Sequence, residues 1–222
     1  MVNQDAKTPR ERYRAQVRTE IKERAWEQIA TAGASALSLN AIAKQLGMSG
    51  PALYRYYAGR DELITELVRD AYRSLADTLR TVSSRPGADV RTLASTLRTW
   101  ALEDPQRYFL IFGTPVPGYH APDDITAIAS EVMATILDAF AELPSSGTAT
   151  AFDAHLEEHR DWADGHPAPA ATLHRALAFW TRLHGTLSLE LAGHFTGMGF
   201  DPARFYAAEL DELTGSEADD GM

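Results

Sequence analysis

Hydrophobic residues recur along this chain at spacings of three and four, the spacing of one face of an α-helix. No segment alternates hydrophobic and polar residues as a half-buried strand would. The pattern therefore predicts an all-α protein. The clearest apolar stripes are Ile21, Ala25, Ile29; Leu63, Leu67, Ala71, Leu75; Val90, Leu93, Leu97, Trp100; Ile125, Ile128, Val132, Ile136, Phe140; and Leu173, Leu177, Trp180, Leu187, Leu191.

Helix-breaking segments divide these stripes into regions. Residues 83–87, SSRPG, interrupt the chain after a helix expected over about 60–80. Further helices are expected over about 18–32, 122–143 and 168–193. The organisation predicted is a disordered basic arm (1–16), a three-helix domain (17–60), a connecting helix (61–82), a larger helical domain (83–214) and an acidic tail (215–222).

Residues 38–57, SLNAIAKQLGMSGPALYRYY, predict two short helices joined by a tight turn. Ser38 and Ser49 are suitable N-caps, and Pro51 suits the first turn of the second helix. Gly47 can take the positive φ that ends the first helix. Leu53 and Tyr57 are four residues apart and can share a buried face, which leaves residues 54–56 largely outside. This is a helix-turn-helix, whose second helix would enter the major groove of DNA.

The charge distribution agrees with that interpretation. The chain has 222 residues and a net charge of −10, which alone would argue against nucleic acid. Residues 1–60, however, carry ten basic and five acidic side chains, a balance of +5, and the remainder carries −15. A basic head on an acidic body would orient the molecule in the field of DNA. At the base of the arm, three arginines could follow a phosphate backbone, although an uninvolved tail is as good an interpretation: Arg10, Arg12 and Arg14.

Composition excludes several other chemistries. There is no cysteine, which removes disulfides, thiolate metal sites and cysteine nucleophiles. No signal-peptide pattern or membrane-length apolar run is present, so a cytoplasmic protein without membrane attachment is expected. Phosphate-loop, nucleophile-elbow and zinc-protease motifs are absent, and we expect neither an enzyme nor a cofactor. His155 and His159 stand four apart but lack a third ligand at fixed spacing, so a solvated acidic helix is favoured over a metal site.

The segment from Ile21 to Leu63, including IAKQLGMSGPALYRYYAGRDEL, resembles the N-terminal domain of TetR/AcrR-type transcriptional regulators. The order and spacing fit the family signature, with departures at Tyr57 (usually Phe), Gly59 (usually polar) and Arg60 (usually Lys). The resemblance implies that Tyr54, Tyr56 and Arg60 contact phosphates. Serine hydroxyls and helix N-terminal amides would add to these contacts.

Base readout is harder to assign from the same resemblance. Such proteins present to the bases an edge that here holds residues with little hydrogen-bonding capacity, so apolar contact with thymine methyls is expected. Arg55 could pair with a guanine or grip a phosphate, and both options stay open. Part of the specificity would then come from DNA shape. The full set of DNA-contact candidates is Ser38, Ser49, Gly50, Pro51, Ala52, Tyr54, Arg55, Tyr56 and Arg60.

A second, looser resemblance covers residues 100–195. Trp180, Leu183, His184 and Gly185 fill the Trp-x-x-Leu-His-Gly pattern of the WHG branch of these regulators. The resemblance implies a ligand-binding and dimerisation domain, with helices 122–143 and 168–193 forming the interface of a homodimer. A small apolar or amphipathic ligand would be held by residues drawn from Trp100, Tyr108, Phe112, Tyr119, Met133, Trp162, His174, Phe179, Trp180 and His184.

The family resemblance implies a repressor that such a ligand releases from a palindromic operator. Two alternatives stay open on sequence alone. One is the same DNA binder acting without a ligand, or as an activator. The other is a helical ligand-binding or enzymatic module whose helix-turn-helix is vestigial.

Overall fold

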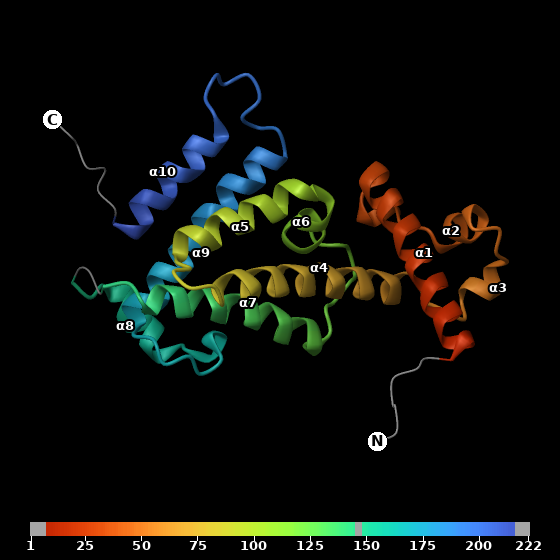
Figure 1. Ribbon diagram of the computed structural model, residues 1–222, viewed down its shortest axis with the longest axis horizontal. Coiled ribbons are helices and arrows are strands. Elements are labelled where there is room, and N and C mark those ends of the chain that lie inside the picture. The colour runs from red at the N-terminus through yellow and green to blue at the C-terminus, as the bar shows by residue number, and fades with distance from the viewer. Residues whose placement is uncertain (1–7, 145–147, 216–222) are drawn as a thin grey trace. The chain divides into compact units, whose positions relative to one another are not determined.

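The computed structural model describes residues 8–144 and 148–215, and every regular element in these ranges is helical (Figure 1). The all-α prediction is thus confirmed. The elements are α1 (Pro9–Ala32), η1 (Ala34–Ala36), α2 (Leu39–Gln45), α3 (Gly50–Leu53), α4 (Arg60–Ser83), α5 (Val90–Glu103), α6 (Pro105–Phe112), α7 (Asp123–Ala141), α8 (Ala151–Glu158), η2 (Asp161–Ala163), α9 (Ala170–Leu191) and α10 (Pro202–Thr214), where η marks a short 3-10 helix. Within the described ranges, no helix combines the length and apolarity needed to cross a membrane.

The chain forms two compact units. The first runs to Ala71 and includes the segment Phe109–Pro122; the second holds Tyr72–Tyr108 and the chain from Asp123 onward. The divisions fall inside α4, the helix expected to connect two domains, inside α6, and at the start of α7.

The first unit is built on α1, whose inward side is apolar. Val17, Ile21, Ala25 and Ile29 are buried along one stripe, as the periodicity predicts. They share the core of this unit with a set of buried side chains from α2, α3, the turn after α3 and the start of α4: Leu39, Ile42, Leu53, Tyr57, Leu63, Ile64 and Leu67.

The start of α1 corrects the prediction of a disordered arm over residues 1–16. The helix begins at Pro9, because Thr8 and Glu11 form a capping box. The Thr8 amide donates to Glu11 Oε2 at 2.7 Å, and the Glu11 amide donates to Thr8 Oγ1 at 3.2 Å. The pattern T-P-R-E is the local signature of this arrangement. Residues 1–7 and the acidic tail from 216 on lie outside the described residues.

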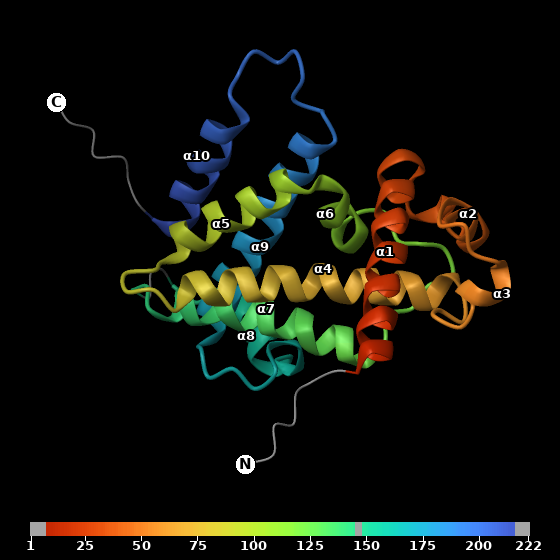
Figure 2. The same ribbon diagram turned by 45° about the vertical axis from the view of Figure 1, so that its right-hand side comes forward.

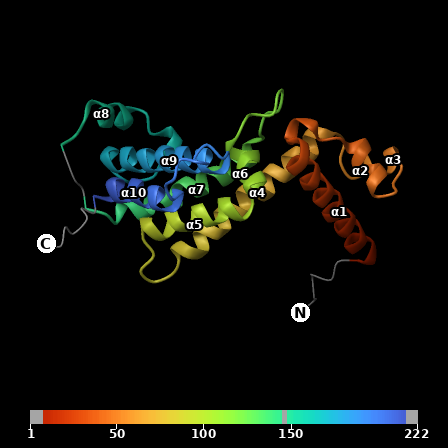
Figure 3. The ribbon, with the colours of Figure 1, turned by 90° about the horizontal axis from the view of Figure 1, so that it is seen from above.

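The second unit packs α5, α7, α9 and α10 around one apolar core. Figure 2 shows α5, α9 and α10 side by side, and Figure 3 shows α8 beside α9. Two fully buried phenylalanines meet edge to face at the centre, with Phe140 and Phe179 ring centroids 5.2 Å apart. The acidic helix expected around His155 is α8, which starts at a Thr150 N-cap and ends before His159.

Candidate nucleic-acid interface

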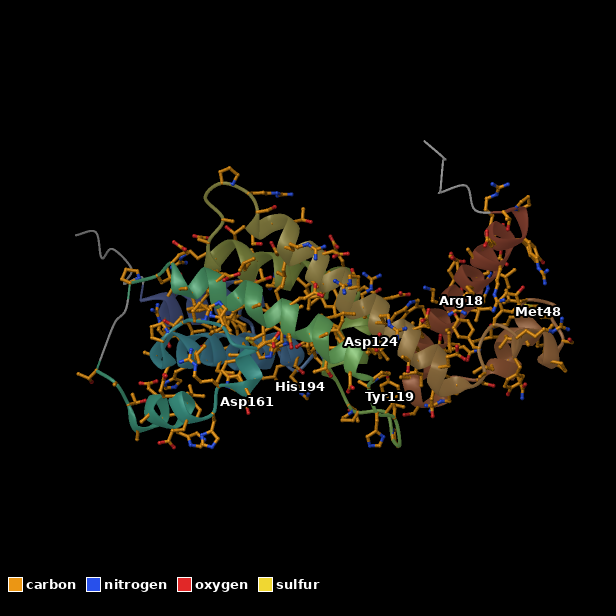
Figure 4. The ribbon with its side chains drawn as sticks, turned by 90° about the horizontal axis from the view of Figure 1, so that it is seen from below. Arg18, Met48, Tyr119, Asp124, Asp161 and His194 are labelled. Carbon is orange, nitrogen blue, oxygen red and sulfur yellow. The ribbon has the colours of Figure 1, made fainter. Side chains whose placement is uncertain are left out.

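The turn between α2 and α3 has the geometry that its sequence predicts. Ser38 Oγ accepts from the Ala41 amide, and Ser49 Oγ accepts from the Ala52 amide, both at 3.3 Å. Gly47 takes a φ of +64° at the end of α2, which only glycine adopts without strain. The Met48 amide then donates to the Ala43 carbonyl at 2.9 Å and closes the turn. Figure 4 labels Met48 in this part of the first unit.

The short helix α3 and the turn that follows it, residues 54–57, expose polar side chains and bury apolar ones. Leu53 and Tyr57 are 0% exposed, whereas Tyr54 is 48% exposed, Arg55 is exposed and Tyr56 is partly exposed. The division between buried and outward side chains therefore agrees with the sequence. Gly50, Pro51 and Ala52 form the first turn of α3; Pro51 is exposed and the other two are partly exposed.

Two arginines of α1 hold the turn that follows α3. Arg18 Nη1 donates to the Tyr56 carbonyl at 2.9 Å, and Arg14 Nη2 approaches the Arg55 carbonyl at 3.4 Å. The Arg18 guanidinium also lies 4.4 Å from the centre of the Tyr57 ring and pairs with Glu66 of α4 at 3.1 Å. The Leu53 carbonyl at the end of α3 already accepts from the Tyr56 and Tyr57 amides, so the two arginines hold the turn that follows α3 rather than the helix itself.

Sequence reasoning did not identify the role of Arg18. Its contacts join residues 38 and 48 positions apart, and no local pattern marks them. Through these contacts Arg18 ties the end of α3 to both α1 and α4.

The contacts of Arg60 differ from those expected of a phosphate-binding residue. Its Nη2 donates to the carbonyls of Ala34 and Ser35 at 3.1 and 3.3 Å, and its Nη1 lies 3.5 Å from Asp61. The η1 carbonyls attract the guanidinium because they lie beside the start of α4. The side chain is still 30% exposed. A phosphate contact by Arg60 stays a prediction, and it would compete with these bonds.

Of the three positions that depart from the family signature, only Tyr57 is fully buried. Its hydroxyl has no hydrogen-bond partner among the described residues. Burial raises the pKa of this phenol to about 12, although the nearby Arg18 charge lowers it. The group therefore stays protonated, and its buried O–H is an unsatisfied donor.

In the second unit, three of the predicted ligand residues come together. The Tyr108 hydroxyl lies 3.0 Å from His184 Nδ1 and 3.2 Å from the His184 carbonyl oxygen, and the Trp180 ring meets His184 edge-on at 4.0 Å between centroids. Burial lowers the pKa of His184 to about 4, so the imidazole is neutral at pH 7. We call Tyr108, Trp180 and His184 the aromatic cluster.

The other predicted ligand residues are dispersed. Trp100 and Phe179 are core residues, 5% and 1% exposed, and Trp100 Nε1 donates to Ser74 Oγ at 3.1 Å. His174 pairs with the buried Asp153 at 2.8 Å. Met133 and Trp162 are partly exposed residues of the second unit, and Phe112 and Tyr119 belong to the first unit.

Two grooves of the second unit lie away from the aromatic cluster. One, of about 400 Å³, is lined mainly by polar and charged groups including Arg80, Asp89, Asp138 and Glu142. The other, of about 320 Å³, is lined by Trp100 together with threonine and serine side chains of α4 and α5. Of the predicted ligand residues, only Trp100 lines either groove. The predicted ligand pocket therefore stays a prediction.

Comparisons with known proteins agree with both halves of the sequence interpretation. Residues 21–67 match the model for bacterial regulatory proteins of the tetR family, and residues 90–213 match a tetracyclin repressor-like C-terminal domain. The HTH-type transcriptional regulator Rv1816 of Mycobacterium tuberculosis is 36% identical over 211 residues, which cover 88% of this chain and 90% of the relative.

Solved structures give the same result for the fold. The crystal structure of SCO4313, described as a regulatory protein, matches with a TM-score of 0.87 and 72% identity, over 94% of this chain and 100% of that one. The SmeT–triclosan complex matches with a TM-score of 0.55 and 15% identity over 93% of each chain. At that identity the second likeness concerns the fold alone.

Proposed function

The chain belongs to the TetR family of DNA-binding transcriptional regulators, and we propose that it is a repressor which a small molecule releases from a palindromic operator. The observation that carries the DNA-binding part is α3 itself. Its buried side packs on the core through Leu53, and the turn that follows it offers two phenols and a guanidinium on the outside, which are groups that bind phosphates and base edges. This role places the protein in the cytoplasm, where operator DNA lies.

Within that proposal, Tyr54 and Tyr56 contact phosphates and Arg55 reads a base or a phosphate. Ser38 and Ser49 serve first as caps, and their hydroxyls can still donate a proton to a phosphate oxygen. Gly50, Pro51 and Ala52 allow the backbone of α3 to approach the groove closely, with apolar contact to thymine methyls.

The DNA-binding role is tested with a duplex that the wild-type protein selects from a random pool. Tyr54→Ala should weaken binding to this duplex, because it removes an exposed phenol at the end of α3. Phe152→Ala is the matched control, since it removes a ring of similar exposure (45%) from α8. Equal affinity of the two variants would contradict the assignment of α3, and failure of the wild type to select any duplex would contradict the function.

A dimer is proposed because one α3 offers few contacts. Two copies would occupy successive major grooves roughly 34 Å apart. From sequence, the α9 stripe that includes Leu173 and Leu187 fits a core or a dimer face equally well, and only the family resemblance favours the dimer face; both residues are 0% exposed and belong to the core of their own chain. That assignment is corrected: the open side of α9 instead carries Thr181, Gly185 and Leu189.

The neighbouring α10 also has an open side of small residues, so we propose that α9 and α10, rather than α9 and α7, form the dimer interface. Ala203, Ala207 and Ala208 are exposed on α10, and small side chains allow helices to approach closely.

The side chain added by Gly185→Gln would begin in open space within its own chain. It should therefore leave the protomer folded and weaken the dimer in sedimentation experiments. Ala127→Gln, on the exposed side of α7, should not; the reverse result would restore the α7 interface.

Ligand control is proposed to act through the second unit, with a small apolar or amphipathic molecule bound near the aromatic cluster. The fold likeness to SmeT, described in complex with triclosan, supports such a ligand class. The residues of α4 are divided between both units, so this helix is a direct covalent route from ligand to α3. Coupling between two sites of this kind is typically about 1–3 kcal/mol. Titration of the protein–operator complex with triclosan, followed by anisotropy, should release DNA in the wild type and less readily in Trp180→Ala.

A further inference from the structure

The first two turns of α1 carry arginines on an exposed surface. All residues from Thr8 to Gln16 are exposed, and Val17 is the first buried residue of the helix. Beyond that point the cations of α1 are paired: Arg18 with Glu66, Lys22 with Asp70 and Arg24 with Glu27. Before it, Arg10 and Arg14 form no ion pair with any residue that the structure describes. Arg18, Lys22 and Arg24 are thus neutralised by acidic side chains, whereas Arg10 and Arg14 are not neutralised by any described residue; we call Arg10 and Arg14 the open arginines.

The open arginines lie on the side of α1 that faces the end of α3. Residues four apart share one side of a helix, and each such step advances about 6 Å along the axis. Arg10, Arg14 and Arg18 follow this spacing. Arg18 and Arg14 both contact carbonyls of the turn that follows α3, and the Arg14 guanidinium lies 5.9 Å from the centre of the Tyr56 ring. Arg10 extends the same row by one more turn.

The capping box makes this row a rigid element. The only acid among residues 8–17 is Glu11, and its carboxylate is engaged by the Thr8 amide and hydroxyl at 2.7 and 2.9 Å. Proline at the first helical position suits the same start. A guanidinium on a formed helix loses less freedom on binding than one on a flexible arm.

We infer that Arg10 and Arg14 form a second phosphate-binding edge, which grips the DNA backbone next to the place where α3 enters the groove. Continuity with α3 identifies the partner: the same duplex whose phosphates meet Tyr54 and Tyr56 lies within reach of Arg14. The inference rests on the proposed function, since it extends the DNA-binding site of that function onto α1.

The experiment compares the salt dependence of DNA binding in the full-length protein and in Arg10→Gln/Arg14→Gln. Glutamine keeps helix propensity and removes charge. Each phosphate bound contributes about 0.9 to the slope of log K against log salt, so removing two arginines from each protomer of a dimer should reduce the slope by about 3.6. When the salt concentration is raised from 50 to 200 mM, both proteins should lose affinity for the duplex. The fold-loss of the wild type should be about 150 times the fold-loss of the variant. The probe is the fluorescein-labelled duplex that the wild type selects from a random pool.

Arg24→Gln is the control, because Arg24 lies on the same helix but pairs with Glu27; its slope should equal that of the wild type. A variant with unchanged slope and affinity overturns the inference. So does a variant with lower affinity and an unchanged slope, since its arginines would act only by positioning α3. Absence of salt-dependent binding in the wild type would instead contradict the proposed function itself.

Discussion

Replacing Tyr57 by phenylalanine should stabilise the DNA-binding unit. The Tyr57 hydroxyl is buried without a hydrogen-bond partner among the described residues, and its pKa, raised to about 12, keeps the proton in place. A buried unsatisfied polar group costs about 1–3 kcal/mol. Removing the oxygen recovers that cost but forfeits some dispersion attraction around the atom. The ring and its contact with Arg18 are retained, and we expect a net gain of about 1 kcal/mol.

Tyr206→Phe is a matched control with the opposite expected sign. Tyr206 is also buried, at 4% exposure, but its hydroxyl donates to the Ala94 carbonyl at 3.0 Å. Removing a satisfied hydroxyl should cost about 0.5–1.5 kcal/mol of stability. The pair therefore distinguishes the effect of the hydrogen bond from the general effect of removing a phenol oxygen.

Hydrogen exchange of backbone amides suits this comparison, because it reports on each unit separately within the intact chain. Protected amides of residues 17–43 and 63–67 should exchange roughly fivefold more slowly in Tyr57→Phe, which corresponds to about 1 kcal/mol. Amides of α5 and α10 should exchange faster in Tyr206→Phe. Faster exchange of the first unit in Tyr57→Phe would refute the reasoning, since it would mean that the hydroxyl is bonded.

Three further changes test other contacts. Arg18→Leu should reduce operator affinity while leaving the salt slope unchanged, because Arg18 holds the Tyr56 carbonyl rather than DNA; a smaller slope would instead indicate a phosphate contact. Ser49→Ala should lower the stability of the first unit by about 1 kcal/mol in hydrogen exchange, because the Ala52 amide loses its cap; unchanged exchange would show that the cap contributes little. Burial lowers the pKa of His184 to about 4, so the unfolded chain binds the proton first and stability falls as pH drops from about 6.5 towards 4. In urea titrations, the free energy of unfolding that is lost between these pH values should be smaller by about 3 kcal/mol in His184→Gln than in the wild type. An equal loss in the variant and the wild type would show that His184 does not contribute.

Sequence reasoning predicted the helix-turn-helix well because its determinants are local. Ser38, Gly47 and Ser49 each act on neighbouring backbone groups, and the buried pair Leu53 and Tyr57 follows from helical spacing alone. The start of α1 is also encoded locally, in the capping box formed by residues 8 and 11. It was missed because the basic composition of the segment was interpreted as an arm.

Other features could not be predicted from local patterns. The Arg60 guanidinium binds carbonyls 25 and 26 residues away, and such contacts form only once the chain has folded. The apolar stripe of α9 posed a different problem. Periodicity shows that Leu173 and Leu187 are buried, but it cannot show whether another helix of the same chain or a second copy buries them.

The short length of α3 explains why so many of its supports lie elsewhere. A helix of four residues has almost no stability of its own, because nucleation is costly and few backbone bonds repay it. Ser49 accepts from the Ala52 amide, Arg14 and Arg18 hold carbonyls of the turn that follows α3, and Leu53 anchors the apolar side of the helix. The outward residues therefore contribute little to folding and are free to contact DNA. It follows that substitutions on α1 should alter DNA affinity as strongly as substitutions on α3 itself, either through charge, as at Arg10, or through position, as at Arg18.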